Sequence, residues 1–306
     1  MFAVNKKKIG IIGLGLMGKP MAITLAKNGF ETWGYDYRPE PIEDLQKFGV
    51  KPAANPAELG LHCDVIIIMV FDYKQTKQVL CGNGGVFSTI KSDSTIIIAN
   101  TISPAEVEEI AEIAHEKHVH VIDSPVSGGI KGAEEGTLTM IVGGAATLLE
   151  DNRDIFNTLG AQIYHVGEKV GSGQMVKAIN QMLNYINAVA TAEALALGSK
   201  AGVDLYALYN VVTHGTGNSS TFMKLAPRMI KQEFPKYSAL KVFMKDTAIV
   251  QSIGKDFEFP MFMAGTVYQI GLLAKSWGLE NEDVACIVKV YEKFLGRPIT
   301  VPEKQS

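Results

Sequence analysis

The chain has few cysteines and no long apolar run, and each absence excludes a class of protein. Its three cysteines, Cys63, Cys81 and Cys286, are odd in number and far apart, so they match neither a disulfide framework nor a metal site. No apolar run approaches the length that crosses a membrane. Basic residues 6–8 follow the first five residues directly, which leaves no room for a signal sequence. We therefore expect a cytoplasmic protein with reduced thiols, no bound metal and no membrane partner.

The chain also lacks a large excess of charge of either sign. Its 29 Lys and Arg residues against 32 Asp and Glu residues give a formal net charge of -3. The basic stripe that binds nucleic-acid phosphates is missing, so we expect no nucleic-acid partner. With 47% hydrophobic and 20% charged residues the composition is that of a globular protein, and 306 residues are enough for two domains.

Short apolar runs alternate with helical patterns along the first half of the chain. The runs occupy residues 8–12, 31–35, 65–70, 95–99, 120–123, 138–142 and 162–166, and helical patterns include residues 104–117 and 147–159. Such alternation predicts a parallel sheet, and unbroken runs such as residues 65–70 suit strands that are covered on both faces. We predict an α/β Rossmann-type, doubly wound domain over residues 1–167.

The second half of the chain shows helical patterns in place of the alternating strands and helices. A glycine-containing turn at residues 167–173 precedes one long helical pattern at residues 174–200, and no convincing strand follows. At 1.5 Å per residue this helix spans roughly 40 Å, enough to pass between domains. We predict an all-helical second domain over residues 168–306 with a long interdomain helix.

A glycine fingerprint stands where the first predicted strand meets a helix. Gly13 suits the tight turn, Gly15 lets a pyrophosphate approach the backbone, and Gly18 allows the helix to pack close to the strand. Free amides at the helix N-terminus then face the phosphates. The motif alone is weak and a plain turn is the alternative, but the strand and helix around it favour a dinucleotide site.

Asp36 follows the second run, about 20 residues further on, where an acid holds the ribose hydroxyls of a bound dinucleotide. An acid repels a 2′-phosphate, which favours NAD. Arg38, two residues later, could pair with that phosphate, so NADP stays possible. The alternative reading of Asp36 is a turn residue at the strand end.

Polar residues recur at helical spacing near the start of the long helix: Gln174, Lys177, Asn180, Gln181 and Asn184. The simplest reading is a solvated helix face. However, the first turns of this helix follow the last strand and should border the cleft that holds a nicotinamide. A lysine there is desolvated and close to a cationic ring, and both effects lower the pKa of an amine toward the range useful for proton transfer.

A second candidate lies after the strand at residues 120–123. Consecutive amides at Ser127, Gly128 and Gly129, with the Ser127 hydroxyl, form a nest for a carboxylate. Ligands bind at this edge of α/β sheets. An ordinary Ser/Gly turn is the alternative.

Four motifs occur in the order and spacing of one enzyme family: GLGLMG from Gly13, DSPVSGG from Asp123, GQMVKAIN from Gly173, and the pair Lys245 and Asp246. On these motifs, which span nearly the whole chain, it resembles the β-hydroxyacid dehydrogenases. That family comprises NAD(P)-dependent 3-hydroxyacid dehydrogenases, including 3-hydroxyisobutyrate dehydrogenase and tartronate semialdehyde reductase. The resemblance implies hydride transfer between a nicotinamide cofactor and a small hydroxycarboxylic acid.

The resemblance also implies residue roles. Lys177 is the catalytic acid/base, Asn180 contacts substrate, and Ser127, Gly128 and Gly129 hold its carboxylate. The implied cofactor residues are Gly13, Leu14, Gly15, Leu16, Met17, Gly18, Asp36, Met69, Val70, Thr101 and Lys245. The chain departs from the family in two places that act largely through the backbone: the loop Met69-Val70-Phe71 lacks the proline that many members carry, and Asn100-Thr101 replaces the common Ser-Thr.

Within the family, residues 215–220 and 238–246 most resemble the L-threonate dehydrogenase branch. This implies a substrate with several hydroxyls, which Asn218 and Ser219 would bind at the distal end of its pocket. The same segment could also turn the chain and cap a helix. We expect a homodimer or a homotetramer.

Other functions stay open. Within the family these are 3-hydroxyisobutyrate dehydrogenase and tartronate semialdehyde reductase. Imine reductases share the architecture but generally lack a lysine at the place of Lys177, and a 6-phosphogluconate-type decarboxylating enzyme needs basic residues for a phosphate and a longer helical domain. A non-catalytic cofactor-binding sensor is disfavoured by Lys177, Asn180 and the Ser-Gly-Gly nest.

Overall fold

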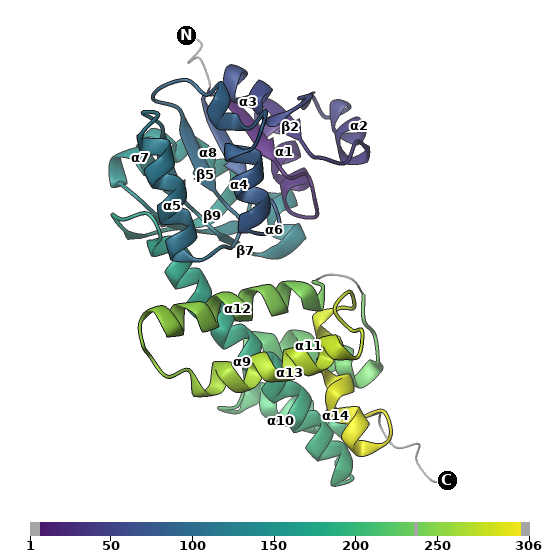
Figure 1. The fold of residues 1–306 in the computed structure, drawn as a ribbon. Helices are drawn as coiled ribbons and strands as arrows, with labels where there is room; N and C mark the ends of the chain where they lie inside the picture. The colour runs from purple at the N-terminus through teal and green to yellow at the C-terminus, as the bar shows by residue number, and fades with distance from the viewer. Residues whose placement is uncertain (1–6, 236–237, 301–306) are drawn as a thin grey trace. The chain divides into compact units, whose positions relative to one another are not determined.

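The computed structural model describes residues 7–235 and 238–300, which fold as two compact units divided between Lys177 and Ala178 (Figure 1). We call them the sheet unit and the helical unit. The sequence predicted a boundary after Gly167. In the structure the first turn of the long helix belongs to the sheet unit, because hydrogen bonds described below tie it to the end of a strand.

The sheet unit contains one nine-stranded sheet with the order β3-β2-β1-β4-β5-β6-β8-β7, and β9 pairs with β8. The strands are β1 (Lys8–Ile12), β2 (Glu31–Tyr35), β3 (Lys51–Pro52), β4 (Val65–Ile68), β5 (Thr95–Ile98), β6 (His120–Asp123), β7 (Val126–Ser127), β8 (Leu138–Gly143) and β9 (Gly160–Gly167). From β3 to β6 all neighbours are parallel. The strand order reverses between β1 and β4, which is the point where doubly wound sheets bind ligands.

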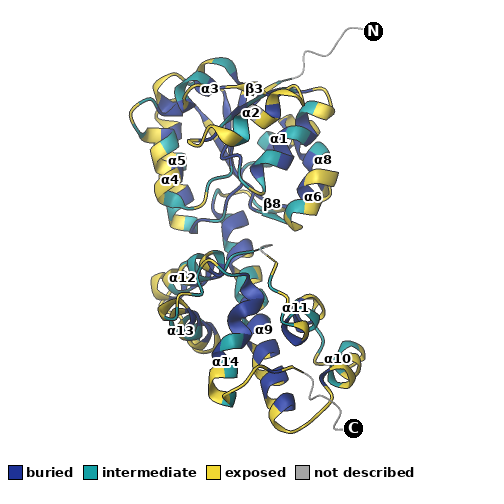
Figure 2. Cartoon of the chain, turned by 90° about the vertical axis from the view of Figure 1, so that its right-hand side faces the viewer, coloured by how far each residue is buried: buried dark blue, intermediate teal, exposed yellow. Residues whose placement is uncertain are grey.

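Helices cover both faces of the sheet. They are α1 (Gly18–Lys27), α2 (Glu40–Gln46), α3 (Pro56–His62), α4 (Tyr73–Cys81), α5 (Pro104–His115), α6 (Gly129–Glu135), α7 (Ala146–Asp151) and α8 (Arg153–Leu159). Figure 2 shows α4 and α5 on one face and α1, α6 and α8 on the other. The wholly buried strand β4 sends Ile67 to the α1 side and Ile66 and Ile68 to the opposite side. The predicted Rossmann-type domain is confirmed.

The structure differs from the predicted sheet unit in three details. Strand β8 runs antiparallel to β6 and β7, because only the short helix α6 and the left-handed Gly136 connect β7 to β8, too little chain for a parallel crossover. The predicted helix at residues 147–159 is two helices that break at Asn152, whose side chain donates to the Leu148 carbonyl. The two-residue strands β3 and β7 were not predicted.

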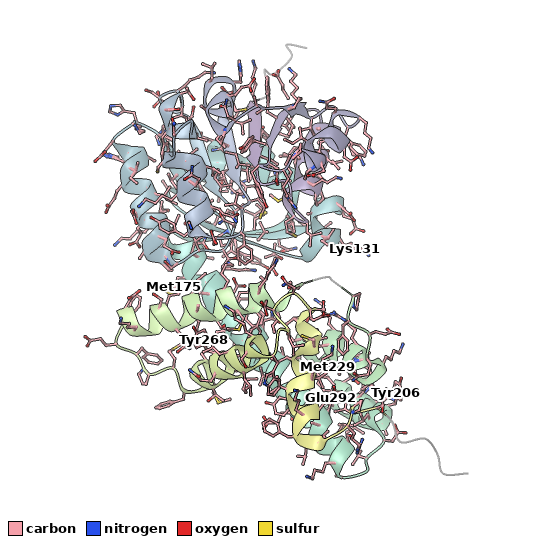
Figure 3. All side chains as sticks on the ribbon, turned by 45° about the vertical axis from the view of Figure 1, so that its right-hand side comes forward. Lys131, Met175, Tyr206, Met229, Tyr268 and Glu292 are labelled. Carbon is pink, nitrogen blue, oxygen red and sulfur yellow. The ribbon has the colours of Figure 1, made fainter. Side chains whose placement is uncertain are left out.

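The helical unit is built around α9 (Ser172–Lys200), the predicted long helix. The helices that follow are α10 (Leu205–His214), α11 (Ser220–Lys231), α12 (Leu240–Asp256), α13 (Phe262–Ser276) and α14 (Val288–Leu295). Figure 2 shows the buried part of α9 with helices on either side of it. Met229 of α11 lies in the core of this unit and Tyr206 of α10 at its surface (Figure 3). The predicted all-helical character is confirmed for the described residues, none of whose helices is long and apolar enough to cross a membrane.

Candidate active site

The loops that follow the parallel strands all lie at the carboxyl edge of the sheet. Gly13 follows β1, Asp36 follows β2, Met69 and Val70 follow β4, and Thr101 comes shortly after β5. Neighbouring parallel strands end at the same edge, so residues far apart in the sequence are brought together there. The predicted cofactor residues of the sheet unit therefore share one edge.

The three glycines of the fingerprint have three different reasons to be glycine. Gly13 has a φ of +93°, and a Cβ on it would lie 2.5 Å from the Met69 carbonyl oxygen. A Cβ on Gly18 would lie 1.8 Å from the Gly13 carbonyl oxygen. At Gly15 nothing lies within 4 Å of a Cβ, so open space faces the backbone there. Two glycines are thus required by packing, and the third borders space that suits a pyrophosphate.

The residues between these glycines differ in exposure. Leu14 is buried, whereas the Leu16 side chain is 62% exposed. Met17 stands immediately before α1. The Lys19 amide already donates to the Gly15 carbonyl oxygen at 3.1 Å, and Pro20 has no amide hydrogen. The positive end of the helix dipole, more than a row of free amides, therefore favours an anion at this point.

Asp36 is buried and accepts four hydrogen bonds. The Leu14 amide donates to Oδ2 at 2.8 Å, and Arg38 donates from its backbone N and from Nε to Oδ1, each at 3.0 Å, and from Nη2 to Oδ2 at 3.3 Å. Burial alone would raise the pKa of Asp36, but the hydrogen bonds from Arg38 and Leu14 outweigh it, so this pKa lies below its usual value. Asp36 is therefore an ionised acceptor at the place predicted for the ribose hydroxyls.

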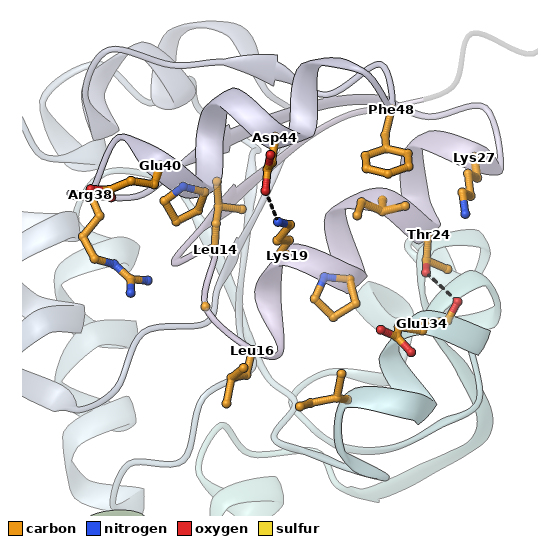
Figure 4. A pocket seen from close by; sticks show the side chains of 15 residues that line it. Leu14, Leu16, Lys19, Thr24, Lys27, Arg38, Glu40, Asp44, Phe48 and Glu134 are labelled. Carbon is orange, nitrogen blue, oxygen red and sulfur yellow. Dashed lines mark hydrogen bonds and ion pairs between the residues drawn. The ribbon is translucent and has the colours of Figure 1, made fainter. Parts of the chain in front are cut away.

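A groove of about 680 Å³ runs from the fingerprint along the outer side of α1 (Figure 4). Leu14, Gly15 and Leu16 line it near the fingerprint, together with Arg38. Further along, Lys19 Nζ lies 2.8 Å from Asp44 Oδ2. The half-exposed Arg38 side chain thus stands where the groove meets the Asp36 carboxylate.

The Ser-Gly-Gly segment has a backbone that only glycine adopts readily. Ser127 ends β7 and is paired with Thr139 of β8, while Gly128 has a φ of +130° and Gly129 a φ of +67°. Both glycines are exposed and stand at the start of α6. This geometry suits the predicted carboxylate nest, whose role stays a prediction.

Lys177 lies close to this nest. It is 6% exposed, and its Nζ donates to the Val126 carbonyl oxygen at 2.7 Å. Val126 directly precedes Ser127 in the chain. A buried amine therefore lies beside the segment predicted to hold the substrate carboxylate.

Asp123, at the end of β6, holds the beginning of α9. It is fully buried, and its Oδ1 accepts from the Gly171 amide at 2.9 Å while Oδ2 accepts from the Gln174 amide at 2.7 Å. Burial raises the pKa of Asp123 to about 6, although the amide hydrogen bonds oppose this shift. The Gln174 side chain accepts from the Ile102 amide and donates to the Asn100 carbonyl. Gln174 is thus part of the core and not of a solvated helix face.

In the helical unit, Asp246 joins three polar side chains. Its Oδ2 accepts from Gln181 Nε2 at 2.6 Å and from the Tyr185 hydroxyl at 2.9 Å, and Lys245 Nζ lies 2.8 Å from Oδ1. Burial, and then the Asp246 charge, hold the pKa of Tyr185 well above its usual value. Lys245 is therefore held close to α9 residues through one buried carboxylate.

The predicted substrate residues of the helical unit have different surroundings. Asn180 is exposed and donates to Gln181. Asn218 donates from Nδ2 to the Thr213 carbonyl at 2.9 Å, while its buried Oδ1 accepts no hydrogen bond. Ser219 Oγ accepts from the Phe222 amide at 2.9 Å and caps α11. The capping alternative is thus correct for Ser219, and Asn218 keeps an available acceptor.

Sequence reasoning did not single out Asp123, Gln174, Tyr185 or Asp246 for a role in the site. Asp123 and Asp246 belong to two of the family motifs, and Gln174 belongs to the polar stripe, but the motifs and the stripe assign none of them a role of its own. A signal existed for Asp123, an ionisable residue at the end of an apolar strand, and for Tyr185, one helical turn after Gln181.

Two known families match the chain in succession. Residues 8–167 match the NAD binding domain of 6-phosphogluconate dehydrogenase, and residues 171–291 match the NAD-binding domain described for NADP-dependent 3-hydroxyisobutyrate dehydrogenase. Together the two matches cover both units. The chain therefore binds a nicotinamide dinucleotide, as Gly15 and Asp36 indicated.

Individual proteins match over nearly their full length. L-threonate dehydrogenase of Cupriavidus necator is 34% identical over 93% of this chain and 96% of its own length. 2-(Hydroxymethyl)glutarate dehydrogenase of Eubacterium barkeri is 33% identical over 94% and 96%. The crystal structure of 3-hydroxyisobutyrate dehydrogenase from Salmonella typhimurium superposes with a TM-score of 0.85 at 31% identity, over 93% of this chain and 100% of that one. The chain belongs to the β-hydroxyacid dehydrogenase family and is an NAD-dependent oxidoreductase of hydroxy acids.

Proposed function

We propose that the protein oxidises L-threonate, or a closely related polyhydroxylated four-carbon acid, at a hydroxyl close to the carboxylate, with NAD⁺ as the acceptor. The observation that carries the proposal is the buried Lys177 amine, 2.7 Å from the carbonyl that precedes the Ser-Gly-Gly nest. An acid/base and an anion nest side by side suit a substrate with a hydroxyl close to a carboxylate. Several of the relatives are named L-threonate dehydrogenases, which favours this substrate.

Lys177 moves the proton of the reaction. A bound nicotinamide would supply the acceptor for the hydride from the carbon that carries the hydroxyl. Lys177, neutral at that moment, takes the hydroxyl proton, and in the reducing direction the charged amine returns it. The Val126 carbonyl orients the amine and accepts one of its hydrogens.

The nest and Asn180 orient the substrate. The amides of Gly128 and Gly129 and the Ser127 hydroxyl hold the carboxylate, so that the reacting carbon faces the nicotinamide. Asn180 stands three residues after Lys177 on α9, on the same side of the helix, and orients either the substrate or the amine.

The cofactor is held by the sheet unit. The backbone of Gly13–Gly18 and the N-terminus of α1 hold the pyrophosphate, with Leu14, Leu16 and Met17 supplying the contacts between the glycines, and Asp36 accepts from the ribose hydroxyls. The family resemblance assigns Met69 and Val70 to the adenosine half, Thr101 to the nicotinamide side, and Lys245 of the helical unit to cofactor binding. Arg38 can leave Asp36 for a 2′-phosphate, so NADP is a second cofactor and NAD the preferred one.

Asn218 determines the preference for a polyhydroxylated acid. Its buried Oδ1 has no hydrogen-bond donor among the described residues, and a distal hydroxyl of the substrate would satisfy this acceptor. The Ser219 hydroxyl accepts from Phe222 and can still donate its proton to the same substrate. 3-Hydroxyisobutyrate is the second candidate substrate, since a relative of 31% identity carries that name. We expect a homodimer or a homotetramer, which light scattering after gel filtration measures.

The first test is reduction of NAD⁺ across a panel of four-carbon aldonates and 3-hydroxyacids. We expect L-threonate to give the highest kcat/KM. Equal turnover of L-threonate and 3-hydroxyisobutyrate would contradict the substrate assignment but not the reaction type.

The second test concerns Lys177. Lys177→Ala should bind NAD normally and lose turnover by roughly 10²–10⁴, the contribution of a positioned acid/base. Lys169, an exposed lysine shortly before α9, is the matched control, and Lys169→Ala should keep wild-type kcat. A kcat near the wild-type value in Lys177→Ala would remove Lys177 from the mechanism.

A further inference from the structure

We propose that Asp123 is a positioning residue for catalysis, because its carboxylate fastens the first turn of α9 to the end of β6 and thereby places the Lys177 amine beside the carboxylate nest. This inference rests on the proposed acid/base role of Lys177. Every contact that carries it lies within the sheet unit.

The contacts form two rungs between the same two segments. The first rung joins the Gln174 amide to Asp123 Oδ2, and the second joins Lys177 Nζ to the Val126 carbonyl oxygen, each across a separation of 51 residues. Gln174 and Lys177 are three apart on α9, and Asp123 and Val126 are three apart after β6. A shift of the helix at the first rung therefore displaces the amine at the second.

Asp123 satisfies groups that α9 itself cannot. The first amides of a helix have no acceptor within it and carry the positive end of its dipole. Asp123 accepts from two such amides, those of Gly171 and Gln174, at 2.9 and 2.7 Å. The charge of the carboxylate and the geometry of its two oxygens both suit this helix end.

The space around the carboxylate allows little adjustment. A Cβ on Gly143 of β8 would lie 2.3 Å from Asp123 Oδ1. A Cβ on Gly173 would lie 2.7 Å from Asp123 Oδ2 and 2.5 Å from the Ile141 carbonyl oxygen. Glycine at both positions lets two strands and the helix approach the same carboxylate, so the position of α9 is narrowly defined.

Gln174 supplies a second attachment, to the loop that follows the neighbouring strand β5. Its side chain donates to the Asn100 carbonyl at 2.9 Å and accepts from the Ile102 amide at 3.2 Å, both in the loop after β5. This loop also contains Thr101, predicted to contact the nicotinamide side of the cofactor. The first turn of α9 is therefore placed against two loops of the predicted site at once.

Burial of a charged carboxylate costs desolvation free energy, so a buried carboxylate that persists indicates a structural or functional role. Burial raises the pKa of Asp123 to about 6, so the folded chain holds an ionised carboxylate at pH 7 against the preference of its surroundings. Such groups gather at functional sites more often than elsewhere.

The test is a double-mutant cycle of Asp123→Asn and Lys177→Ala. Asn keeps the shape but turns an NH₂ group toward a backbone amide, so α9 should move. We expect Asp123→Asn alone to lower kcat by about 10- to 100-fold with the KM for NAD within about twofold of wild type. In the Lys177→Ala background the same change should cost less than about twofold, because the residue that Asp123 positions is gone.

Each outcome separates the two proposals. Near-normal turnover of Lys177→Ala overturns the proposed acid/base role of Lys177, on which this inference rests. Two results would contradict the positioning role of Asp123 while Lys177→Ala is itself impaired. Either Asp123→Asn lowers kcat by the same factor in both backgrounds, or it leaves kcat unchanged in both. A purely structural role would instead weaken NAD binding and kcat together.

Two further variants complete the experiment. Asp64 Oδ2 accepts the Lys8 amide at 2.9 Å just before β4, at the opposite edge of the sheet, so Asp64→Asn is the matched control and should keep wild-type kcat. Gln174→Met removes the attachment to the loop after β5 and replaces Asp123→Asn if that variant does not fold. It should show the same loss of kcat in the wild-type background and the same lack of effect in the Lys177→Ala background.

Discussion

Asp36 has two roles at the scale of the single residue. It is the predicted acceptor for the cofactor ribose, and it is also the partner of Arg38, which donates to both of its oxygens. The pair keeps Asp36 ionised while partly neutralising the charge that would repel a 2′-phosphate. We therefore expect the preference for NAD or NADP to depend on whether Arg38 binds the Asp36 carboxylate or a 2′-phosphate.

Replacing Asp36 should shift this preference. Asp36→Ala removes the acceptor for the ribose hydroxyls and a repulsive charge, so we expect the KM for NAD to rise about tenfold or more while the KM for NADP changes less. Steady-state kinetics with both cofactors measures the ratio. Arg38→Ala is the opposing control and should weaken NADP use only. A wild-type enzyme that already prefers NADP would contradict this reading of Asp36.

Asn218 should affect substrate preference but not NAD binding. Asn218→Ala removes an acceptor for a substrate hydroxyl, and we expect the preference for L-threonate over 3-hydroxybutyrate to fall by about tenfold, with the KM for NAD unchanged. The neighbouring Ser220 is exposed, so Ser220→Ala is the control and should leave both values unchanged. An unaltered preference in Asn218→Ala would mean that the segment serves only as a turn and a helix cap.

At the scale of the element, the turn from β1 to α1 contains two glycines that packing requires and a third, Gly15, that we predict to be required for cofactor binding. A Cβ at Gly13 or Gly18 would contact backbone oxygens, whereas a Cβ at Gly15 would enter open space. We therefore expect folding to require Gly13 and Gly18, and cofactor binding to require Gly15.

This separation is testable by substitution of Gly15. Gly15→Ala should leave the free energy of unfolding within about 0.5 kcal/mol of wild type, as for an unstrained surface change, yet raise the KM for NAD at least about tenfold, because the methyl group occupies the space beside the phosphates. Urea unfolding and NAD titration measure the two quantities. Gly18→Ala should lose stability as well as binding. Normal NAD affinity in Gly15→Ala would place the pyrophosphate elsewhere.

At the scale of the whole molecule, Asp123 links stability to pH. Its pKa is about 6 in the folded chain and 3.8 in the unfolded one, so the folded state binds more protons between these values. The stability that this group contributes is complete below about pH 4 and is lost as the pH rises through 6, by up to about 3 kcal/mol.

Comparison of wild type with Asp123→Asn isolates this effect, because Asn does not titrate and all other groups are shared. Between pH 4 and pH 7.5 the difference in unfolding free energy should shift by up to about 3 kcal/mol in favour of the variant. Urea unfolding at both pH values provides the measurement. A difference that stays constant over this range would show that the pKa of Asp123 is not raised in the folded state.

Much of the molecule could be predicted from local sequence. The β-branched runs at residues 8–12 and 65–68 form strands because their side chains suit a sheet covered on both faces. Gly13 and Asp36 are recognisable because each directly follows a strand, about 20 residues apart, as a dinucleotide fingerprint requires. Lys177 was found in the same way, from helical spacing and a motif.

Only the tertiary structure decided features that depend on distant partners. Strand β8 is antiparallel because α6 and Gly136 turn the chain back within a few residues, which apolar periodicity does not register. Asp123 and Gln174 are 51 residues apart, and Asp246 and Tyr185 are 61 apart, so nothing in either local segment predicts their hydrogen bonds. A local pattern determines which element forms and which face it buries. The burial of a polar group, and the partner that satisfies it, depend on how those elements pack.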